Sequence, residues 1–92
     1  MELRQLRYFV GVSEAGSLLK AAGRLHVAQP ALGQQITALE HALGARLFDR
    51  SSRGVTLTEA GKVFLEHARQ VLADAERARQ AVRDLAAVPR GE

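Results

Sequence analysis

The feature that most constrains this chain is a long stretch from Glu59 to about Ala87, which has no proline and has Gly61 as its only glycine. Its apolar residues recur with a seven-residue period, which predicts one long helix with a coiled-coil seam. The seam positions are Phe64, Ala68, Val71, Ala75, Ala78, Val82 and Leu85. Such a helix is about 40 Å long. The residues before it form too small a body to cover that length. We therefore expect a second copy of the chain to cover the seam in a homodimer, with an intramolecular core stripe as the alternative.

Three shorter helices are predicted before this stretch, at about residues 3–14, 18–25 and 29–43. Each has apolar residues at three- and four-residue steps, the spacing of one helix face. Ser17 is a suitable N-cap for the second helix, because its hydroxyl can accept a hydrogen bond from a first-turn amide. Gly44 is placed to end the third helix. The second and third helices are separated by only a tight turn, which is typical of a helix-turn-helix.

Two short apolar pieces flank a turn-rich tetrapeptide within residues 47–57, so we expect a small β-hairpin there. Thr58 then serves as the N-cap of the long helix. The predicted fold is therefore mainly α: a winged helix-turn-helix of three helices and a hairpin wing, followed by a long dimerisation helix.

The predicted domain boundaries follow from these elements. Residues 1–57 form the winged helix-turn-helix, and residues 58–88 form the linker helix. Residues 89–92 contain proline and glycine, which predicts the start of a hinge to a domain that is absent from this sequence.

The predicted third helix carries polar residues on the face opposite its apolar stripe. These candidates for contact with DNA are Gln29, Pro30, Gly33, Gln34 and Thr37. Glutamine can bond adenine through two hydrogen bonds, and the threonine methyl can contact the thymine methyl. A glycine allows close approach of the helix. The alternative interpretation is a solvated face that happens to carry glutamines.

The predicted wing carries Arg50 and Arg53, which suit contact with phosphate or insertion into a narrow minor groove. A surface turn with ordinary solubilising charges is the alternative. The segment from Leu43 to Leu57 is basic, whereas the acids and bases from Thr58 onward balance.

Several function classes are disfavoured. The absence of cysteine excludes disulfides and thiolate metal sites. The chain has too few aromatic residues for a single-strand stacking platform. No apolar run reaches the roughly 20 residues of a membrane span, and the start lacks the apolar core of a signal peptide, so we expect a cytoplasmic protein. The histidines are far apart in sequence, and no phosphate loop or nucleophile elbow is complete. We expect neither enzyme activity nor a cofactor or metal.

With these elements placed, the sequence resembles the DNA-binding domain of LysR-type bacterial transcriptional regulators, over residues 1 to about 87. The matching elements are Leu6 and Phe9, Gly16-Ser17, Ala21-Ala22, Leu25, Gln29-Pro30-Ala31-Leu32, Gln35-Ile36, Leu39-Glu40, Leu43-Gly44, Leu47-Phe48, Arg50, Leu57-Thr58 and Gly61. The resemblance implies a linker helix that pairs antiparallel with its twin. It also implies a dimer on an interrupted inverted repeat of double-stranded DNA, and possible tetramers of the intact protein. A small-molecule effector would bind a further domain past about Pro89.

The sequence departs from the family pattern in the third helix. The family commonly has serine at the positions of Ala28 and Gly33, and often arginine at that of Gln34. We expect a weaker grip on phosphate there and more reliance on Gln29, Gln34 and Thr37. The predicted function is sequence-specific DNA binding; the alternatives are a helical protein-interaction module and a nonspecific architectural DNA protein.

Overall fold

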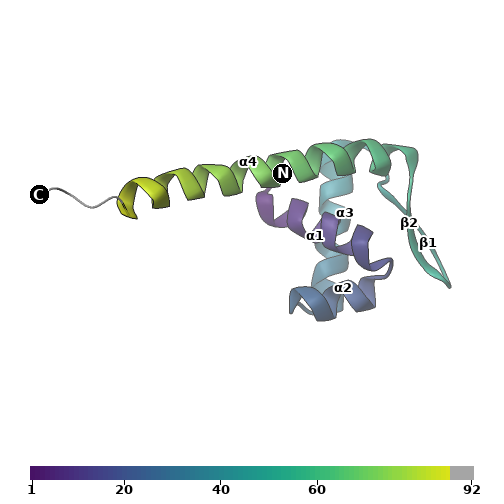
Figure 1. Cartoon of the computed structure of the whole chain (residues 1–92). Coiled ribbons are helices and arrows are strands. Elements are labelled where there is room, and N and C mark those ends of the chain that lie inside the picture. The colour runs from purple at the N-terminus through teal and green to yellow at the C-terminus, as the bar shows by residue number, and fades with distance from the viewer. Residues whose placement is uncertain (88–92) are drawn as a thin grey trace, which may run out of the picture.

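The computed structural model describes residues 1–87 of the chain (Figure 1). Its elements are α1 (Leu3–Ala15), α2 (Leu18–Leu25), α3 (Gln29–Leu43), β1 (Phe48–Ser51), β2 (Gly54–Leu57) and α4 (Glu59–Ala87). The two strands form an antiparallel hairpin. This is the predicted fold: a winged helix-turn-helix followed by one long helix. The predicted hinge at residues 89–92, and residue 88 of the predicted linker segment, lie outside the described residues.

The predicted caps are present at the helix ends. The Ser17 hydroxyl accepts a hydrogen bond from the Lys20 amide at 2.9 Å and so begins α2. Gly44 ends α3 in the left-handed conformation, at φ 69°, which glycine adopts without a steric penalty. The α2–α3 turn begins at His26, which adopts the same conformation at φ 58°. Ala28 precedes α3 without a side-chain cap, as its missing hydroxyl requires.

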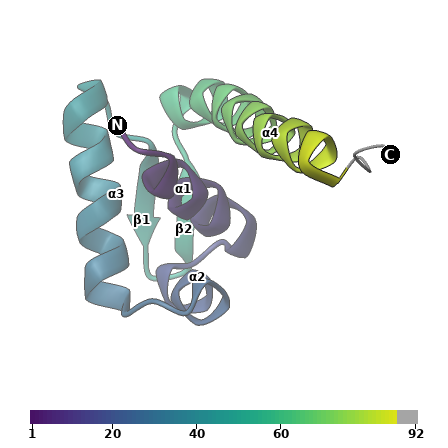
Figure 2. The same ribbon diagram turned by 90° about the vertical axis from the view of Figure 1, so that its left-hand side faces the viewer.

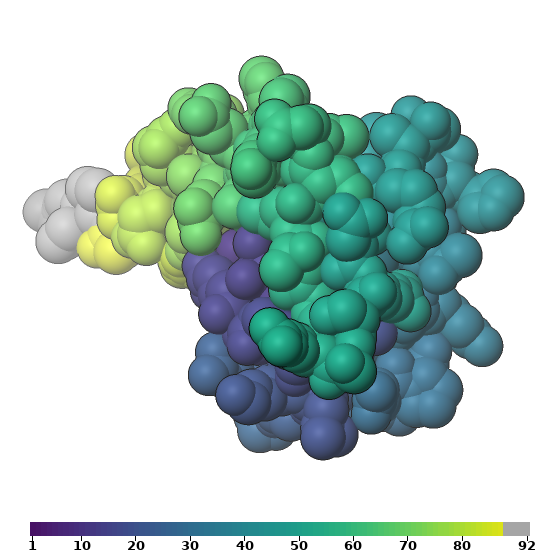
Figure 3. Space-filling model, turned by 90° about the vertical axis from the view of Figure 1, so that its right-hand side faces the viewer, coloured from purple at the N-terminus to yellow at the C-terminus, as the bar shows by residue number. Residues whose placement is uncertain are grey.

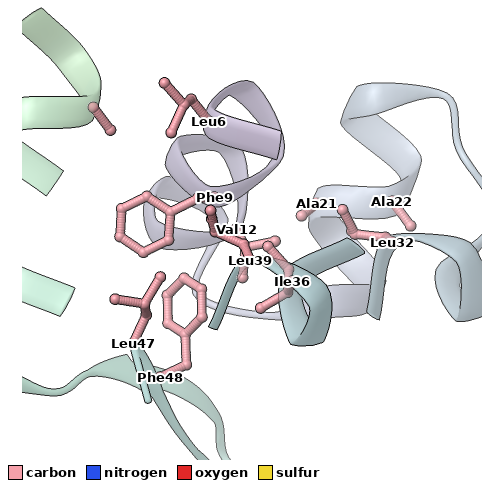
Figure 4. Packing of buried hydrophobic residues seen from close by; sticks show 11 residues of the cluster. Leu6, Phe9, Val12, Ala21, Ala22, Leu32, Ile36, Leu39, Leu47 and Phe48 are labelled. Atoms are coloured by element: carbon pink, nitrogen blue, oxygen red, sulfur yellow. The ribbon is translucent and has the colours of Figure 1, made fainter. Parts of the chain in front are cut away.

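An aromatic cluster joins three elements that are far apart in the sequence. The Phe9 ring of α1 lies 5.2 Å from the Phe48 ring of β1 and 5.1 Å from the Phe64 ring of α4, measured between centroids. Figure 4 shows Phe9 and Phe48 beside the aliphatic core of α1 and α3. The other buried core residues are Leu6, Val12, Ala21, Ala22, Leu32, Ile36, Leu39, Leu47 and Ala68. In Figure 2, α1 lies between α3, α4 and the hairpin, so it is the central helix of this core.

Two close backbone contacts hold the wing against the body. The Val55 amide donates to the Gly16 carbonyl at 3.0 Å, and a Cβ on Gly54 would lie 2.4 Å from that same carbonyl oxygen. At the other end of the hairpin, the Thr58 amide continues the strand pairing by donating to the Leu47 carbonyl at 3.0 Å. Gly61 of α4 packs against this carbonyl, since an added Cβ would lie 2.1 Å from its oxygen. The orientation of the wing therefore follows from the α1–α2 turn and from the start of α4. Figure 3 shows the hairpin in front of the body, with α3 beside it.

The long helix is covered by the body along only its first half. Gly61 and Ala68 are buried, and Leu65, Leu72 and Ala75 are half-buried; these residues share the side of α4 that faces the body. Every described residue after Ala75 is exposed, and Figure 1 shows this half of α4 extending beyond the body.

The predicted heptad seam needs a correction at its N-terminal end. Ala68 is only 1% exposed in the single chain, so it is a core residue and has almost no surface left for a partner. Phe64 is partly covered by Phe9. The reason is that a strict seven-residue repeat drifts by about 20° per heptad on a straight α-helix, so the set of Ala68 and Ala75 turns toward the body.

Candidate nucleic-acid interface

The two sides of α3 differ sharply in exposure. Leu32, Ile36 and Leu39 are fully buried, at 0% exposure, because they recur at helical spacing and pack on the core. The opposite side presents the predicted contact residues to solvent. Gln29, Pro30, Gln34 and Thr37 are exposed, and Gly33 is half-buried. The structure thus brings all five predicted residues of α3 together on one accessible surface, hereafter the α3 face.

Neighbouring glutamines on α3 have different environments. The Gln35 side-chain carbonyl accepts a hydrogen bond from the Gln5 amide group of α1 at 3.2 Å, and Gln35 is half-buried. Gln34 is exposed on the α3 face. Gln35 therefore joins α3 to α1, whereas the donors and acceptors of Gln34 are accessible to a base edge.

A glycine in the middle of a helix normally weakens it, by about 0.5–1 kcal/mol relative to alanine. Among residues 1–87, no other part of the chain lies within 4 Å of a Cβ placed on Gly33. Packing therefore does not require glycine at this position. Close approach of an external partner to the α3 face is a reason for glycine that agrees with this geometry.

In the wing, the acidic side chain of Asp49 points away from the side of β1 that carries Arg50. In β1, Arg50 lies on the same side of the strand as the buried Phe48, toward α3, because side chains alternate along a strand. Asp49 lies on the other side, paired across the hairpin with Thr56. Arg53 is in the turn at the tip, where its amide donates to the Ser51 hydroxyl at 3.2 Å. Both predicted wing arginines are exposed.

Ion pairing divides the basic residues into two groups. All five bases of α4 are within 4.0 Å of a carboxylate oxygen: Lys62, Arg69, Arg77, Arg79 and Arg83. Within residues 1–87, no ion pair involves Arg7, Lys20, Arg24, Arg46, Arg50 or Arg53. The unneutralised positive charge therefore lies on the helix-turn-helix and the wing. This distribution favours attraction of a polyanion to the body rather than to α4.

A second accessible surface runs along α4. The large apolar residues exposed there are Val63, Val71, Val82 and Leu85, which are 65%, 41%, 68% and 76% exposed. At the start of α4 a groove of about 310 Å³ lies between α3 and α4, lined by Leu43, Ala45, Leu47, Ala60, Val63, Phe64 and His67. On a wheel of 3.6 residues per turn, Ala60, Phe64 and His67 continue into Val71, Ala78, Val82 and Leu85.

The sequence alone does not predict this groove, because the four-residue step from Leu39 to Leu43 groups Leu43 with the buried apolar residues of α3. Leu43 is 39% exposed, since it lies in the last turn of α3, past the core. A helical wheel with 3.6 residues per turn, rather than a strict heptad repeat, places Ala60 and His67 on the same side of α4 as Phe64 and Val71.

The described part of the chain shows neither a metal cluster nor a membrane segment. Residues 1–87 contain no group of three or more His, Cys, Asp or Glu side chains that could hold a metal ion. In the same residues, no helix is both long and apolar enough to span a bilayer.

Comparison with known proteins gives one consistent result. Residues 3–62 match the family model described as "Bacterial regulatory helix-turn-helix protein, lysR family". The chain is 60% identical over 77 residues to the HTH-type transcriptional regulator TfdT of Cupriavidus pinatubonensis (strain JMP 134 / LMG 1197), covering 84% of this chain and 34% of that regulator. It is 48% identical over 92 residues to the nitrogen assimilation regulatory protein nac of Klebsiella aerogenes, covering 100% of this chain and 30% of that protein. The chain thus spans about a third of the length of these regulators.

Solved structures agree in fold. The chain superposes on the CbnR_DBD-DNA complex with a TM-score of 0.89 at 51% identity, covering 94% of this chain and 99% of that one. It superposes on the BenM_DBD/catB site 1 DNA complex with a TM-score of 0.92 at 42% identity, covering 97% of this chain and 100% of that one. These relatives are transcriptional regulators rather than enzymes.

Proposed function

This chain belongs to the LysR family of bacterial regulatory helix-turn-helix proteins, and on that premise we propose that it binds double-stranded DNA with sequence specificity as the N-terminal domain of a transcriptional regulator. The observation that carries the proposal is the α3 face, which is polar, exposed and free of basic residues. It is flanked by the wing arginines, which have no carboxylate partner within residues 1–87. The titles of the two solved relatives describe complexes of their domains with DNA, which supports the same partner here.

The residues of the α3 face and of the wing have different roles in this proposal. Gln29, Gln34 and Thr37 contact base edges in the major groove, while Pro30 and Gly33 allow the helix to approach closely. Arg50 and Arg53 contact phosphates or a narrow minor groove, so they strengthen binding to every sequence.

The exposed stripe of α4 supports a homodimer. On an isolated chain, water would contact the apolar side chains of Val71, Val82 and Leu85, which is unfavourable. The groove beside Val63 is a second apolar surface. An antiparallel pair of α4 helices covers both surfaces at once. A parallel pair joins the exposed halves of α4 but leaves the groove open, so the antiparallel arrangement is the better solution.

The spacing of the stripe suggests a register for this pair. If the two-fold axis passes between Asp74 and Ala75, Val71 lies opposite Ala78 of the partner subunit and Phe64 lies opposite Leu85 of the partner subunit. Apolar residues then meet over most of the stripe, and Val82 lies opposite His67 of the partner subunit. The two α3 faces of such a dimer suit an interrupted inverted repeat, because a protein dyad matches a DNA dyad.

The remainder of the regulator is proposed from the family alone. The relatives are about three times as long as this chain, which leaves room for an effector-binding domain after α4 and for assembly beyond the dimer, such as a tetramer. The working place of such a regulator is the cytoplasm, where bacterial DNA is found.

Selection of binding sites from a random duplex library tests the DNA proposal directly. The 92-residue chain at near-physiological salt should enrich an interrupted inverted repeat. Gln29→Ala should relax discrimination at one base position by about 1–3 kcal/mol, whereas Gln70→Ala, at an exposed glutamine of α4, should leave the selected sequence unchanged.

Arg53→Ala should weaken binding to all sequences and flatten the dependence of affinity on salt concentration. If the folded chain enriches no sequence, the proposal of sequence-specific DNA binding is wrong, and a protein-interaction module is favoured instead.

Cysteine cross-linking tests the dimer, because the chain has no native cysteine. In the proposed register, the double variant Val71→Cys/Ala78→Cys forms disulfide-linked dimers, since Cα atoms must lie within about 7 Å for a disulfide. Val71→Cys alone would cross-link efficiently only in a parallel pair or in an antiparallel pair whose two-fold axis lies at residue 71, and that result would reject the proposed register. Leu85→Glu should produce monomers in sedimentation, whereas Ala73→Glu, on the opposite side of α4, should leave the dimer intact.

A further inference from the structure

A groove separates the C-terminal half of α3 from the wing. It has a volume of about 590 Å³, and its lining includes Thr37 and His41 of α3, Arg46 of the following loop, and Arg50 of β1. Thr37 also belongs to the α3 face, and Arg50 also belongs to the wing. The groove therefore connects the two surfaces to which DNA binding has just been assigned, and its lining includes two residues, His41 and Arg46, that have no role in that proposal.

The groove is electrostatically positive. Within residues 1–87, neither Arg46 nor Arg50 has a carboxylate partner. The one acid of the lining, Glu40, already accepts hydrogen bonds at one oxygen from the Leu47 amide at 2.8 Å and the Phe48 amide at 3.3 Å. Those two amide dipoles offset part of its negative charge, so the arginines determine the sign of the groove.

Two further details suit the binding of an anion. The Arg46 guanidinium donates one hydrogen bond to the Phe48 carbonyl at 3.2 Å, which orients the group and leaves most of its five donors available. The Glu40 and His41 carbonyls at the end of α3 accept from the amides of Gly44 and Ala45. The negative end of the α3 dipole is therefore largely satisfied before any ligand arrives.

We propose that this groove binds a backbone phosphate of the DNA strand that passes between α3 and the wing, with Arg46 as the phosphate ligand and His41 as a neighbouring contact. The inference rests on the proposed function. When α3 lies in the major groove and the wing lies over the adjacent backbone, one phosphodiester strand runs between them. Thr37 of the α3 face and Arg50 of the wing both line the groove, so a strand in contact with both surfaces would cross it.

The phosphate assignment has a quantitative signature. Removing one phosphate contact lowers the slope of log affinity against log salt by about 0.9, which corresponds to an affinity loss of about five-fold at 0.15 M salt. The loss should be equal on a selected site and on random duplex, because phosphates carry no sequence information.

Fluorescence titrations of labelled duplex with the 92-residue chain test this at several salt concentrations. Arg46→Gln should show the smaller slope and the five-fold loss, and Arg46→Lys should retain most of the slope. His41→Glu introduces a negative charge without removing the Arg46–Phe48 hydrogen bond, and it should weaken binding at least as much. Arg77→Gln, in the exposed half of α4 that extends beyond the body, is the matched control and should match the wild type. Thermal unfolding of each variant separates loss of fold from loss of binding.

The outcomes are distinguishable. If the wild type binds no duplex at all, the proposed function fails and this inference fails with it. If the wild type binds but folded Arg46→Gln and His41→Glu keep its slope and affinity, only the phosphate site is rejected. A loss confined to the selected site would instead make Arg46 a base-reading residue and overturn the assignment. Stoichiometric binding of inorganic phosphate without DNA, at constant ionic strength, would reassign the groove to a free phosphate ligand.

Discussion

The junction between the wing and α4 predicts a large effect for a single methyl group. A Cβ added to Gly61 would lie 2.1 Å from the Leu47 carbonyl oxygen, 3.1 Å from the Leu47 carbonyl carbon and 3.0 Å from a methyl carbon of Leu57. The Leu47 carbonyl cannot turn away without a penalty, because it accepts the hydrogen bond of the Thr58 amide. Gly61→Ala therefore forces α4 away from the base of the wing.

Two opposing terms set the magnitude of this effect. Alanine is better than glycine within a helix by about 0.5–1 kcal/mol. Overpacking a close-packed site costs about 1–3 kcal/mol, and the upper end applies here because the clash is with backbone. The net destabilisation is then about 2 kcal/mol. For a chain of this size that lowers the melting temperature by roughly 8–16 °C.

The assay is thermal unfolding followed by circular dichroism at one fixed protein concentration, because dimer formation makes the melting temperature depend on concentration. Gly23→Ala is the matched control: nothing lies within 4 Å of its added Cβ, so it should raise stability by about 0.5–1 kcal/mol. If Gly61→Ala proved as stable as the wild type, the reasoning from this close approach would be wrong.

Four other variants have expected outcomes from the same structure, each measurable by unfolding. Thr58→Ala should lose about 1–2 kcal/mol, because the hydroxyl caps α4 by accepting from the Gly61 amide at 2.9 Å; Thr58→Ser should retain most of that stability. Glu40→Ala should lose about 1–3 kcal/mol by leaving two backbone amides of the loop and β1 without their acceptor, and a Glu40→Gln variant that was no better would contradict the role of the acceptor oxygen. His26→Gly should gain about 0.5–1 kcal/mol, because φ is 58° there and left-handed backbone is unfavourable for residues with a Cβ. Gly33→Ala should gain a similar amount, since its Cβ has no contact within 4 Å among the residues that the structure describes. It should nevertheless bind DNA more weakly in the same fluorescence titration; unchanged affinity would place Gly33 away from the DNA.

The local elements could be predicted because their signals lie within a few residues. Ser17 and Thr58 accept amides three positions later in the chain, and Gly44 ends its helix through its own backbone freedom. The spacing of Leu32, Ile36 and Leu39 is enough to say that one side of α3 is buried and that the other is exposed. The composition of the α3 face was therefore predictable together with its position. Whether its residues contact DNA stays a prediction.

What needed the tertiary structure is which surface of each element other elements cover. The periodicity of α4 indicated a seam but not that the body would bury Ala68, since that depends on how the body packs on the helix. The apolar spacing of α3 separates Gln34 from Gln35, but it does not reveal that Gln35 bonds Gln5 of α1. The groove of Arg46 and His41 likewise exists only because the wing is held at Gly16 and Leu47. The sequence by itself determined the helices and strands and the residue types on their exposed sides, because helix periodicity and caps involve residues only a few positions apart. The tertiary structure alone decided which residues share a site, because that depends on contacts between segments that are far apart in the chain.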